Sequence, residues 1–441
     1  MSSQSESTTS LAKQLFSMTW PMLFGVLSMM SFQLVDSAFI GQLGILPLAA
    51  QGFTLPIQMI VIGLQVGLGI ATTAIIARAL GAGNENYAKQ LGGLVLMIGS
   101  VGMVCFCLLI WWLRHPILTL LSAPESVFPV IDAYWPYWLF SVFVGALTYF
   151  YYSICRSNGN TFLPGIMMVV TSVLNLILDP IFIFTLDLGL NGAAIATILS
   201  FIIGLLIVAS QVTRKHWVSF DWKDLNVGKS LASIGHIMGP AMVSQLLPSA
   251  SSILATKLIA GFGTAAVASW ALGSRFEFFI IVSVLALTMS MPPMVGRLLG
   301  ANKIAEIREV VSIACRFVLG FQLLVAIVTF LASDFLANLM TSEKAVSEIL
   351  NWHLVLVPIS LGSLGICMLM VSVANALGKS YTALSISALR LFVFFLPCLW
   401  IGSELAGLKG LFVGVLIGNL LAGLCAWNMY QRLLRKIELG S

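Results

Sequence analysis

Charged side chains are scarce in this sequence. Asp, Glu, Lys and Arg make up 9% of its 441 residues, whereas soluble domains carry about 25%. Hydrophobic residues make up 59%, and no segment between the apolar stretches is long enough for a soluble domain. The composition therefore excludes an ordinary soluble protein and indicates a polytopic membrane protein.

The residue patterns of enzymes and metal sites are also missing. The 7 Cys are not spaced as in disulfide frameworks or zinc sites. No Walker sequence and no nucleophile–base combination occurs, and "GLQVGLG" at 63–69 is typical of helix packing. We therefore expect neither an enzyme nor an ATPase, and no resident metal or cofactor. The first residues lack the basic region and cleavage site of a signal peptide, so the first apolar stretch should remain.

Apolar stretches long enough to cross a bilayer alternate with short polar turns along the whole chain. They predict an all-α polytopic membrane protein with twelve transmembrane helices. The predicted helices cover residues 13–40, 48–78, 92–122, 128–155, 161–185, 189–212, 232–258, 262–296, 310–338, 343–375, 380–402 and 406–434.

The distribution of basic residues predicts the orientation. If the N-terminus lies inside, the inner helix ends and loops hold most of the 22 Lys and Arg, as the positive-inside rule requires. Both termini are then cytoplasmic, in a bacterial inner (plasma) membrane. Topology explains these basic residues, so we expect the lipid bilayer and no nucleic acid as partner. Nothing in the sequence demands more than a monomer.

The chain contains a repeat with an offset of about 219 residues. The matching pairs are "RALGAGN" at 78–84 with "RLLGANK" at 297–303, Trp20-Pro21 with Gly239-Pro240, Gly159 with Gly378, and "GLNG" at 189–192 with "GLKG" at 407–410. Each half has an even number of predicted helices, so both halves share one orientation. We expect two six-helix bundles around a central cleft: an N-lobe over 1–213, a cytoplasmic linker over 214–231 and a C-lobe over 232–441. This architecture suits a transporter that works by alternating access.

Two acids within predicted transmembrane helices distinguish the halves. Asp36 is the one charged residue between Lys13 and Arg78, although a charge at the bilayer centre costs roughly 2.5–3.5 kcal/mol. At the repeat offset, Asp36 corresponds to Ala255, and Asp179 falls opposite Cys398. The second half keeps the scaffold without these acids, so they look functional rather than structural.

Helix rise places further polar groups at the depth of the acids. At 1.5 Å per residue, Asn175 and Asp179 on the fifth predicted helix and Thr197 on the sixth lie in the outer half of the membrane, as does Asp36. Neighbouring carboxyl groups share protons as a coupled pair, and oxygen ligands also suit Na⁺. These four residues therefore predict a proton or sodium site. The alternative is a hydrogen-bonded cluster that only joins helices.

The stretch "NLILDPIFIFTLDLGLNGAAIAT" at 175–197 resembles the signature of the multidrug and toxic compound extrusion (MATE) family, and "RALGAGN" resembles the family's first cytoplasmic loop. The presence of an acid, Asp36, in the first helix resembles the pattern of the DinF-like bacterial branch. The resemblance implies export of cationic, amphipathic or aromatic drugs in exchange for H⁺ or Na⁺. It also implies that Asp36, Asn175, Asp179 and Thr197 carry the coupling ion, with H⁺ favoured here.

Two other classes of transport protein remain as alternatives. A lipid-linked oligosaccharide flippase has a related architecture, but its cleft should be basic where the deep charges of this chain are mainly acidic. An ion channel would need a continuous polar pore, which the sequence does not display.

Pro21 and Gly25 are candidate hinge residues in the first helix. Pro21 removes the backbone hydrogen bond to the carbonyl of Ser17, and Gly25 follows one turn later. Our hypothesis is that protonation of Asp36 changes this bend; a static bend is the alternative.

Several other residues are weaker candidates for the lining of the cleft. These are Gln33, Tyr149, Tyr152, Arg275 and Glu277. The pair Arg275 and Glu277 lies two residues apart and points to different helix faces, which favours separate structural partners.

Aromatic and histidine residues near helix starts are interpreted as interfacial. The "YWPYW" stretch at 134–138 predicts an aromatic belt at the membrane surface, and His353 is assigned to an interface rather than to proton transfer.

Overall fold

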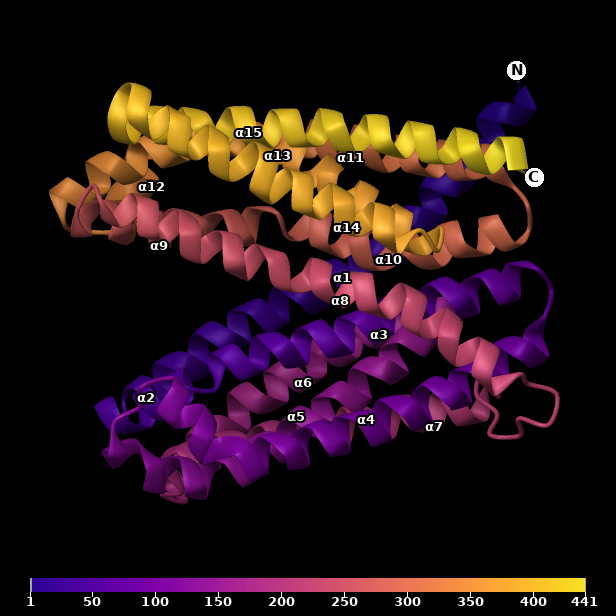
Figure 1. Ribbon diagram of the computed structural model, residues 1–441, viewed down its shortest axis with the longest axis horizontal. Helices are drawn as coiled ribbons and strands as arrows, with labels where there is room; N and C mark the ends of the chain where they lie inside the picture. Colours follow the sequence, from indigo (N-terminus) through magenta and orange to yellow (C-terminus); the bar gives the residue numbers. More distant parts are fainter. Residues whose placement is uncertain (1, 441) are drawn as a thin grey trace. The chain divides into compact units, whose positions relative to one another are not determined.

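The computed structural model describes residues 2–440, with side chains from residue 10 to residue 439. The described residues are helical almost throughout, and no strand occurs among them (Figure 1). The all-α class expected from composition is confirmed.

The first half of the chain contains seven α-helices and two short helical turns in order along the sequence. They are α1 (Ser2–Gly41), α2 (Ile45–Gly52), α3 (Leu55–Gly81), α4 (Glu85–Leu120), η1 (Glu125–Val127), α5 (Phe128–Ser157), α6 (Phe162–Pro180), η2 (Ile181–Thr185) and α7 (Gly189–Arg214).

The second half contains eight α-helices and one π-helical segment. They are α8 (Val227–Ala260), α9 (Thr264–Ile280), α10 (Val282–Gly300), α11 (Ile304–Leu331), α12 (Ser333–Met340), α13 (Lys344–Ala376), α14 (Ser380–Ala388), η3 (Leu389–Phe395) and α15 (Leu396–Gly440).

Eleven segments of the described chain are long and apolar enough to cross a membrane. The last of them, Ser380–Leu439, has 60 residues and would extend about 90 Å as one helix, three times the thickness of a hydrocarbon core. Its backbone leaves the helical conformation at Ala406 and Gly407. The segment therefore makes two crossings, and the break falls at the start of the second of the two predicted helices, 380–402 and 406–434.

The predicted eighth helix, 262–296, is wrong in one respect, because the structure divides it into α9 and α10 at Ile281. The buried amide of Gln322 on α11 donates a hydrogen bond to the carbonyl of Ile280 at 3.0 Å. That carbonyl lies at the end of α9, where intrahelical donors are missing. A residue distant in sequence thus supplies a hydrogen-bond donor to the carbonyl group at the break.

The repeat recurs in the backbone hydrogen bonds. In the turn after α3, the amides of residues 82, 83 and 84 donate to the carbonyls of 78, 80 and 79; after α10, the amides of 301, 302 and 303 donate to those of 297, 299 and 298. Gly83 and Asn302 occupy the same position of the two turns, and both have positive φ. This geometry ends a helix with a left-handed residue. The two halves therefore share turns as well as helices.

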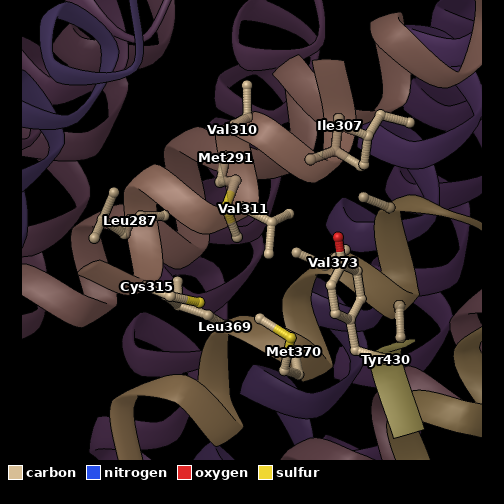
Figure 2. Packing of buried hydrophobic residues seen from close by; sticks show 14 of the residues in the cluster. Leu287, Met291, Ile307, Val310, Val311, Cys315, Leu369, Met370, Val373 and Tyr430 are labelled. Atoms are coloured by element: carbon tan, nitrogen blue, oxygen red, sulfur yellow. The ribbon is translucent and has the colours of Figure 1, made fainter. Parts of the chain in front are cut away.

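By their contacts the described residues form two compact units. The N-terminal unit is Ser17–Met238, and the C-terminal unit comprises the residues from Gly239 on together with the start of α1 up to Phe16. Leu11 and Leu15 accordingly belong to the core of the C-terminal unit, which gathers side chains of α10, α11, α13 and α15 around Met291, Val311 and Tyr430 (Figure 2). The division lies within α8 rather than in the expected linker 214–231.

The segment between α7 and α8 packs on α4. The amide of Ser219 donates to the carbonyl of Lys89 at 2.9 Å, and the side chain of Gln90 donates to the carbonyl of Asp221 at 2.9 Å. Residues 215–226 are therefore held against the N-terminal unit by hydrogen bonds to its backbone and side chains.

Candidate functional site

Helices α1 and α6 run side by side in the same direction within the N-terminal unit. Each contact joins a residue of α1 to one about 143 positions later in the chain. The contacts are Trp20 with Phe162 (5.9 Å between ring centroids), Pro21 with Gly165, Gly25 with Met168, and Phe39 with Phe184 (6.1 Å). This parallel pairing places Asp36 beside Asp179, although 142 residues separate them in the sequence.

The carboxyl groups of Asp36 and Asp179 lie close enough to interact directly. Asp179 is fully buried and Asp36 is partly buried. A carboxylate has no hydrogen to donate, so a hydrogen bond between two carboxyl groups requires that one of them carries a proton. The second oxygen of Asp36, Oδ1, is buried without a partner among the described residues. The pair is therefore arranged to hold one proton between two helices.

Asn175 links Asp179 to Thr197 on α7. When Asp179 is ionised, the amide nitrogen of Asn175 donates to its two oxygens at 2.7 and 3.3 Å. The amide oxygen then accepts from the Thr197 hydroxyl at 3.0 Å. Nitrogen and oxygen of the amide are assigned here from their partners, since a carboxylate needs a donor opposite it. In this state the side chains of Asp179, Asn175 and Thr197 all have hydrogen-bond partners.

The same side chains also have hydrogen-bond partners when Asp179 carries a proton. Its hydroxyl then donates to the oxygen of Asn175. The amide nitrogen of Asn175 donates to Thr197 at 3.0 Å, and the Thr197 hydroxyl donates to the carbonyl of Ala193 at 3.0 Å. Protonation thus reverses the direction of the hydrogen bonds from α6 to the backbone of α7. The structure brings together all four residues that the sequence placed in the ion site.

Tyr134 is a neighbour of Asp36 that sequence reasoning missed. It lies on α5, buried, and close enough to Asp36 for their charges to interact. The interpretation of 134–138 as an interfacial belt is wrong for Tyr134, Trp135 and Trp138, which are all buried, and fits Tyr137, which is exposed. The sequence contains no signal that separates these residues, because aromatic side chains occupy positions 134, 135, 137 and 138 alike.

The hinge candidates Pro21 and Gly25 lie where the backbones of α1 and α6 approach each other closely. A Cβ atom built on Gly165 would overlap the carbonyl group of Pro21, and one built on Gly25 would lie 2.9 Å from the carbonyl oxygen of Gly165. The backbone of α1 is helical across both positions. Whether the bend changes during transport stays a prediction.

The other cleft candidates have different surroundings. Gln33 on α1 is exposed. Tyr149 is partly buried, with the guanidinium of Arg156 at 5.1 Å from its ring centroid. Tyr152 is buried at the contact of α5 with Gly204 of α7. Tyr152 thus packs inside the N-terminal unit.

In the C-terminal unit, Glu277 has an ion-pair partner that the sequence did not indicate. Its Oε1 lies 2.5 Å from Nε2 of His353, and His353 is fully buried. The assignment of His353 to a membrane interface is therefore wrong. Arg275 forms no ion pair in the part of the chain that the structure describes.

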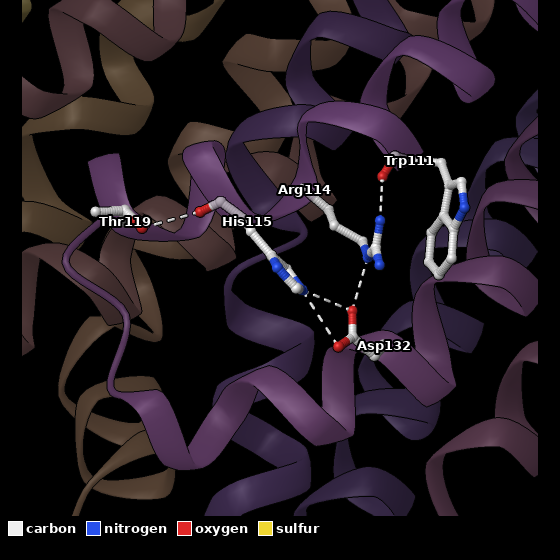
Figure 3. Close-up of polar contacts among 5 residues, drawn as sticks. All are labelled: Trp111, Arg114, His115, Thr119 and Asp132. Atoms are coloured by element: carbon white, nitrogen blue, oxygen red, sulfur yellow. Dashed lines mark hydrogen bonds and ion pairs between the residues drawn. The ribbon is translucent and has the colours of Figure 1, made fainter.

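A separate ion-pair cluster around one acid, Asp132, joins α4 and α5. Asp132 accepts from Arg114 at 2.7 Å and lies 2.9 Å from His115, while Arg114 also donates to the carbonyl of Trp111 and stacks on its ring (Figure 3). The side chain of Asp132 is 39% exposed. Exposed pairs of this kind join helix ends and contribute little energy.

The repeat appears again when the chain is compared with known families. The MatE family model matches residues 21–181 and residues 240–401, two segments whose starts are separated by the repeat offset. The chain belongs to the MatE family. It is accordingly a multi-pass membrane transporter and not an enzyme.

Solved structures of other MatE proteins superpose closely. The Vibrio cholerae MATE transporter VcmN in its bent form is 68% identical, with 98% of this chain and 99% of that chain covered and a TM-score of 0.97. A mutant of VcmN with one aspartate replaced by asparagine gives a TM-score of 0.96 over 98% of both chains. The twelve-helix MATE fold is therefore confirmed.

Two more distant relatives carry names that describe substrates. The FAD transporter of Shewanella oneidensis is 29% identical over 97% of this chain and 96% of its own length. The multidrug export protein MepA of Staphylococcus aureus is 25% identical over 94% of this chain and 92% of its own length.

Proposed function

We propose that this MatE protein is a secondary active multidrug antiporter, which exports cationic or amphipathic drugs in exchange for H⁺ through Asp36 and Asp179. The neighbouring carboxyl groups of Asp36 and Asp179, with Asn175 joining Asp179 to Thr197, carry the proposal. A bilayer interior admits such acids only at a cost, and intramembrane acids usually mark ion pathways. The relationship to multidrug export proteins supports drugs as the substrates.

The hydrogen-bond chain suggests how a proton acts. With Asp179 ionised, the amide of Asn175 is held by the carboxylate and draws the Thr197 hydroxyl toward α6. With Asp179 protonated, that hydroxyl donates to the carbonyl of Ala193 and accepts a hydrogen bond from the amide nitrogen of Asn175. A proton entering from the outer side would in this way change the hydrogen bonds between α6 and α7. The packing of α1 and α6 on α7 would change with them. The proton then leaves to the cytoplasm.

The membrane and orientation follow from the sequence prediction. An antiporter of this kind operates in the bacterial inner membrane, with both termini cytoplasmic and the proton-motive force directed inward. The export of a monovalent cation against 100 mV costs about 2.3 kcal/mol, which the entry of one proton offsets.

Na⁺ is the alternative coupling ion at the same site. Carboxylate, amide and hydroxyl oxygens are all suitable ligands for a hard cation. A sodium ion would need both carboxyl groups ionised, whereas a hydrogen bond between Asp36 and Asp179 would need a proton. Two ionised carboxylates so close together repel each other, so we favour H⁺.

A flavin dinucleotide is the second candidate substrate, favoured by the relationship to the FAD transporter of Shewanella oneidensis. The two substrate classes differ in charge. An interior-negative potential opposes the export of a cationic drug and assists the export of an anionic dinucleotide. An imposed membrane potential thus separates them.

The test uses inverted membrane vesicles with a cationic fluorescent dye or FAD outside and an imposed pH gradient or Na⁺ gradient. Asp36→Asn and Asp179→Asn keep the size of the side chain and remove the titratable group. Asp132→Asn is the matched control, since it removes an exposed aspartate of the same unit. Each variant is checked by size-exclusion chromatography before transport is measured.

We expect dye uptake driven by the pH gradient in wild type and in Asp132→Asn, and a loss of at least about tenfold in both site variants, equivalent to about 1.4 kcal/mol. Dye uptake that is driven by the Na⁺ gradient and not by the pH gradient would identify Na⁺ as the coupling ion in place of H⁺. Normal uptake by both site variants would refute the role of the pair. Uptake of FAD without uptake of the dye would assign the dinucleotide as substrate.

A further inference from the structure

The C-terminal unit contains an arginine deep in a transmembrane segment that the proposed mechanism does not use. Arg390 is the one charged residue between Lys379 and Glu404, a run that forms α14, η3 and the first part of α15. A charge in the hydrocarbon region is costly, so charged residues at this depth usually face a bundle interior or a cavity and mark the path of a substrate or ion. Arg390 therefore needs a partner of opposite charge.

Two helices give the depth of Arg390. It lies ten residues beyond Ser380, where α14 begins, which corresponds to about 15 Å along the helix axis. Its side chain is close enough to the thiol of Cys367 for their charges to interact, and Cys367 lies nine residues, or about 14 Å, before the end of α13 at Ala376. The turn 377–379 joins the two helices, so both depths are measured from the same place. The hydrocarbon core is about 30 Å thick, so these depths place Arg390 near its middle.

Arg390 has no partner in the part of the chain that the structure describes. Its guanidinium forms no ion pair, hydrogen bond or ring contact there. The side chain is half-buried, and none of its nitrogen atoms is fully enclosed by the protein. The neighbouring thiol of Cys367 is buried, and a thiol among apolar groups stays protonated and neutral. A guanidinium does not lose its proton in proteins, so the charge persists and its N–H donors stay open to a group from outside the chain.

The neighbouring helices supply no counter-charge at this depth. On α13 no Asp, Glu, Lys or Arg follows Glu348, and on α15 none occurs between Lys409 and Arg432. The α14 helix has none at all. The deep acid of this unit, Glu277 on α9, is already paired with His353. A counter-ion for Arg390 would therefore come from a ligand.

The repeat shows that a bundle can be built without this charge. At offsets of 218 and 219, Arg390 corresponds to Ser172 and Thr171 on α6. Both residues are neutral and buried, and the hydroxyl of Thr171 donates to the carbonyl of Met167 at 2.8 Å. The first half thus has a hydrogen-bonded hydroxyl group where the second half has an unpaired cation. A residue needed only to hold the bundle together would be expected in both halves.

The backbone at Arg390 also differs between the halves. The segment η3 (Leu389–Phe395) is π-helical, whereas residues 170–176 of the first half lie within the α-helical part of α6. Directly before η3, the hydroxyl groups of Ser387 and Ser244 are hydrogen-bonded at 2.7 Å, which anchors α14 to α8. Short π-helical segments within α-helices are rare and occur frequently at functional sites. The segment that sets the direction of Arg390 is therefore specific to the second half.

The chemistry of the guanidinium defines the ligand. Its planar fork of N–H donors matches two oxygens of a phosphate or carboxylate group and bonds to both at once. Lipid phosphates lie at the membrane surface, whereas Arg390 lies near the middle, where a transported molecule has to pass. We propose that Arg390 binds a phosphate group of an anionic substrate. The inference rests on the proposed transport function and gives its second candidate substrate, the flavin dinucleotide, a contact for the pyrophosphate.

The test measures flavin binding to the purified full-length protein in lipid nanodiscs, by fluorescence anisotropy and without an ion gradient. Three probes share the flavin ring system and differ in charge: riboflavin is neutral, FMN has one phosphate and FAD has a pyrophosphate. Arg390→Gln removes the charge and keeps a polar side chain, and Arg390→Lys keeps the charge. Arg316→Gln is the matched control, since it removes an exposed arginine of the same unit.

We expect wild type to bind FAD and FMN more tightly than riboflavin. In Arg390→Gln the affinity for FAD and FMN should fall at least about tenfold, equivalent to about 1.4 kcal/mol, while the affinity for riboflavin stays the same. Unchanged riboflavin binding shows that the variant is folded. Arg390→Lys should retain part of the preference for phosphate, because an ammonium keeps the charge without the planar fork. Arg316→Gln should bind all three probes as wild type does.

Equal affinity of wild type and Arg390→Gln for FAD, or no binding of FAD by wild type, would overturn the proposal. A lipid phosphate is the other source of the same chemistry, reached by extension of the side chain toward the membrane surface. In that case Arg390→Gln would retain less phospholipid after purification, measured by phosphorus analysis, and would bind the three flavins as wild type does. That result would assign Arg390 to lipid and overturn its role in substrate binding.

The binding measurement is independent of the proposed antiport. It uses neither the cationic dye nor an ion gradient, and it does not involve Asp36 or Asp179. Arg390 repels cations, so Arg390→Gln should also leave the uptake of the cationic dye undiminished. Failure of the drug-transport assay would therefore leave the phosphate contact standing, and failure of the flavin measurement would leave the antiport standing.

Discussion

Replacement of Gly165 by alanine tests the close contact of α1 and α6 that brings the two aspartates together. A Cβ atom at this position would overlap the carbonyl carbon and oxygen of Pro21. Both groups belong to helix backbone, so neither can rotate away. The two helices must separate by several tenths of an ångström or more, near the point from which they run in parallel to Asp36 and Asp179.

The magnitude follows from overpacking. An extra methyl group in a filled interior typically costs about 1–3 kcal/mol. Gly102 on α4 is the matched control, because no atom lies within 4 Å of a Cβ atom built there. At such an open helical position, Gly→Ala should stabilise the protein by about 0.4–1 kcal/mol. We therefore expect the two variants to differ by roughly 1.5–4 kcal/mol, with opposite signs relative to wild type.

The assay is equilibrium unfolding of the purified protein in mixed micelles with increasing denaturing detergent, with drug transport in vesicles measured in parallel. We expect Gly165→Ala to unfold earlier than wild type and to lose H⁺-driven transport, and Gly102→Ala to retain both. Equal stability of the two variants would refute the inferred approach of α1 to α6. Lower stability with normal transport would separate the packing of these helices from the function of the acids.

Two further outcomes are expected in the N-terminal unit. Thr197→Val leaves the Asn175 oxygen without its donor when Asp179 is ionised, a loss of about 1–3 kcal/mol for a buried polar atom. Transport should therefore fall in Thr197→Val and persist in Thr197→Ser. Equal transport by both variants would contradict the hydrogen bonds inferred between Asp179, Asn175 and Thr197. Pro21→Ala restores a backbone donor to α1, so a moving hinge predicts slower transport at normal expression, whereas unimpaired transport would leave Pro21 a static bend.

The helices and the repeat were predictable because their causes are local. Apolar runs of sufficient length must cross a bilayer as helices, since no water is present to bond the backbone. The turn sequences at 78–84 and 297–303 contain the glycine or asparagine that a left-handed helix end needs. Asp36 and Asp179 were predictable for a related reason, because an acid in an apolar run is conspicuous wherever its partner lies.

The failures have the opposite cause. The division of α9 from α10 depends on Gln322, which lies on another helix and reaches the carbonyl of Ile280. Tyr134 was taken for a membrane-surface residue because composition alone does not reveal which face of α5 is covered. His353 was misassigned for the same reason, since a single ring near a helix start has no sequence signal for burial.

The amino-acid sequence alone determined the membrane class, the helices, the twofold repeat and the two acids that only one half carries. These follow from hydrophobicity and from short motifs, which act over one helix or one turn. The tertiary structure decided which distant groups meet: Asp36 with Asp179 through the parallel contact of α1 and α6, and Glu277 with His353 across α9 and α13. Such pairs depend on helix packing, in which small residues such as Gly165 and Gly273 set the distance between helices. That distance depends on both helices together, so the sequence of one helix alone does not determine it.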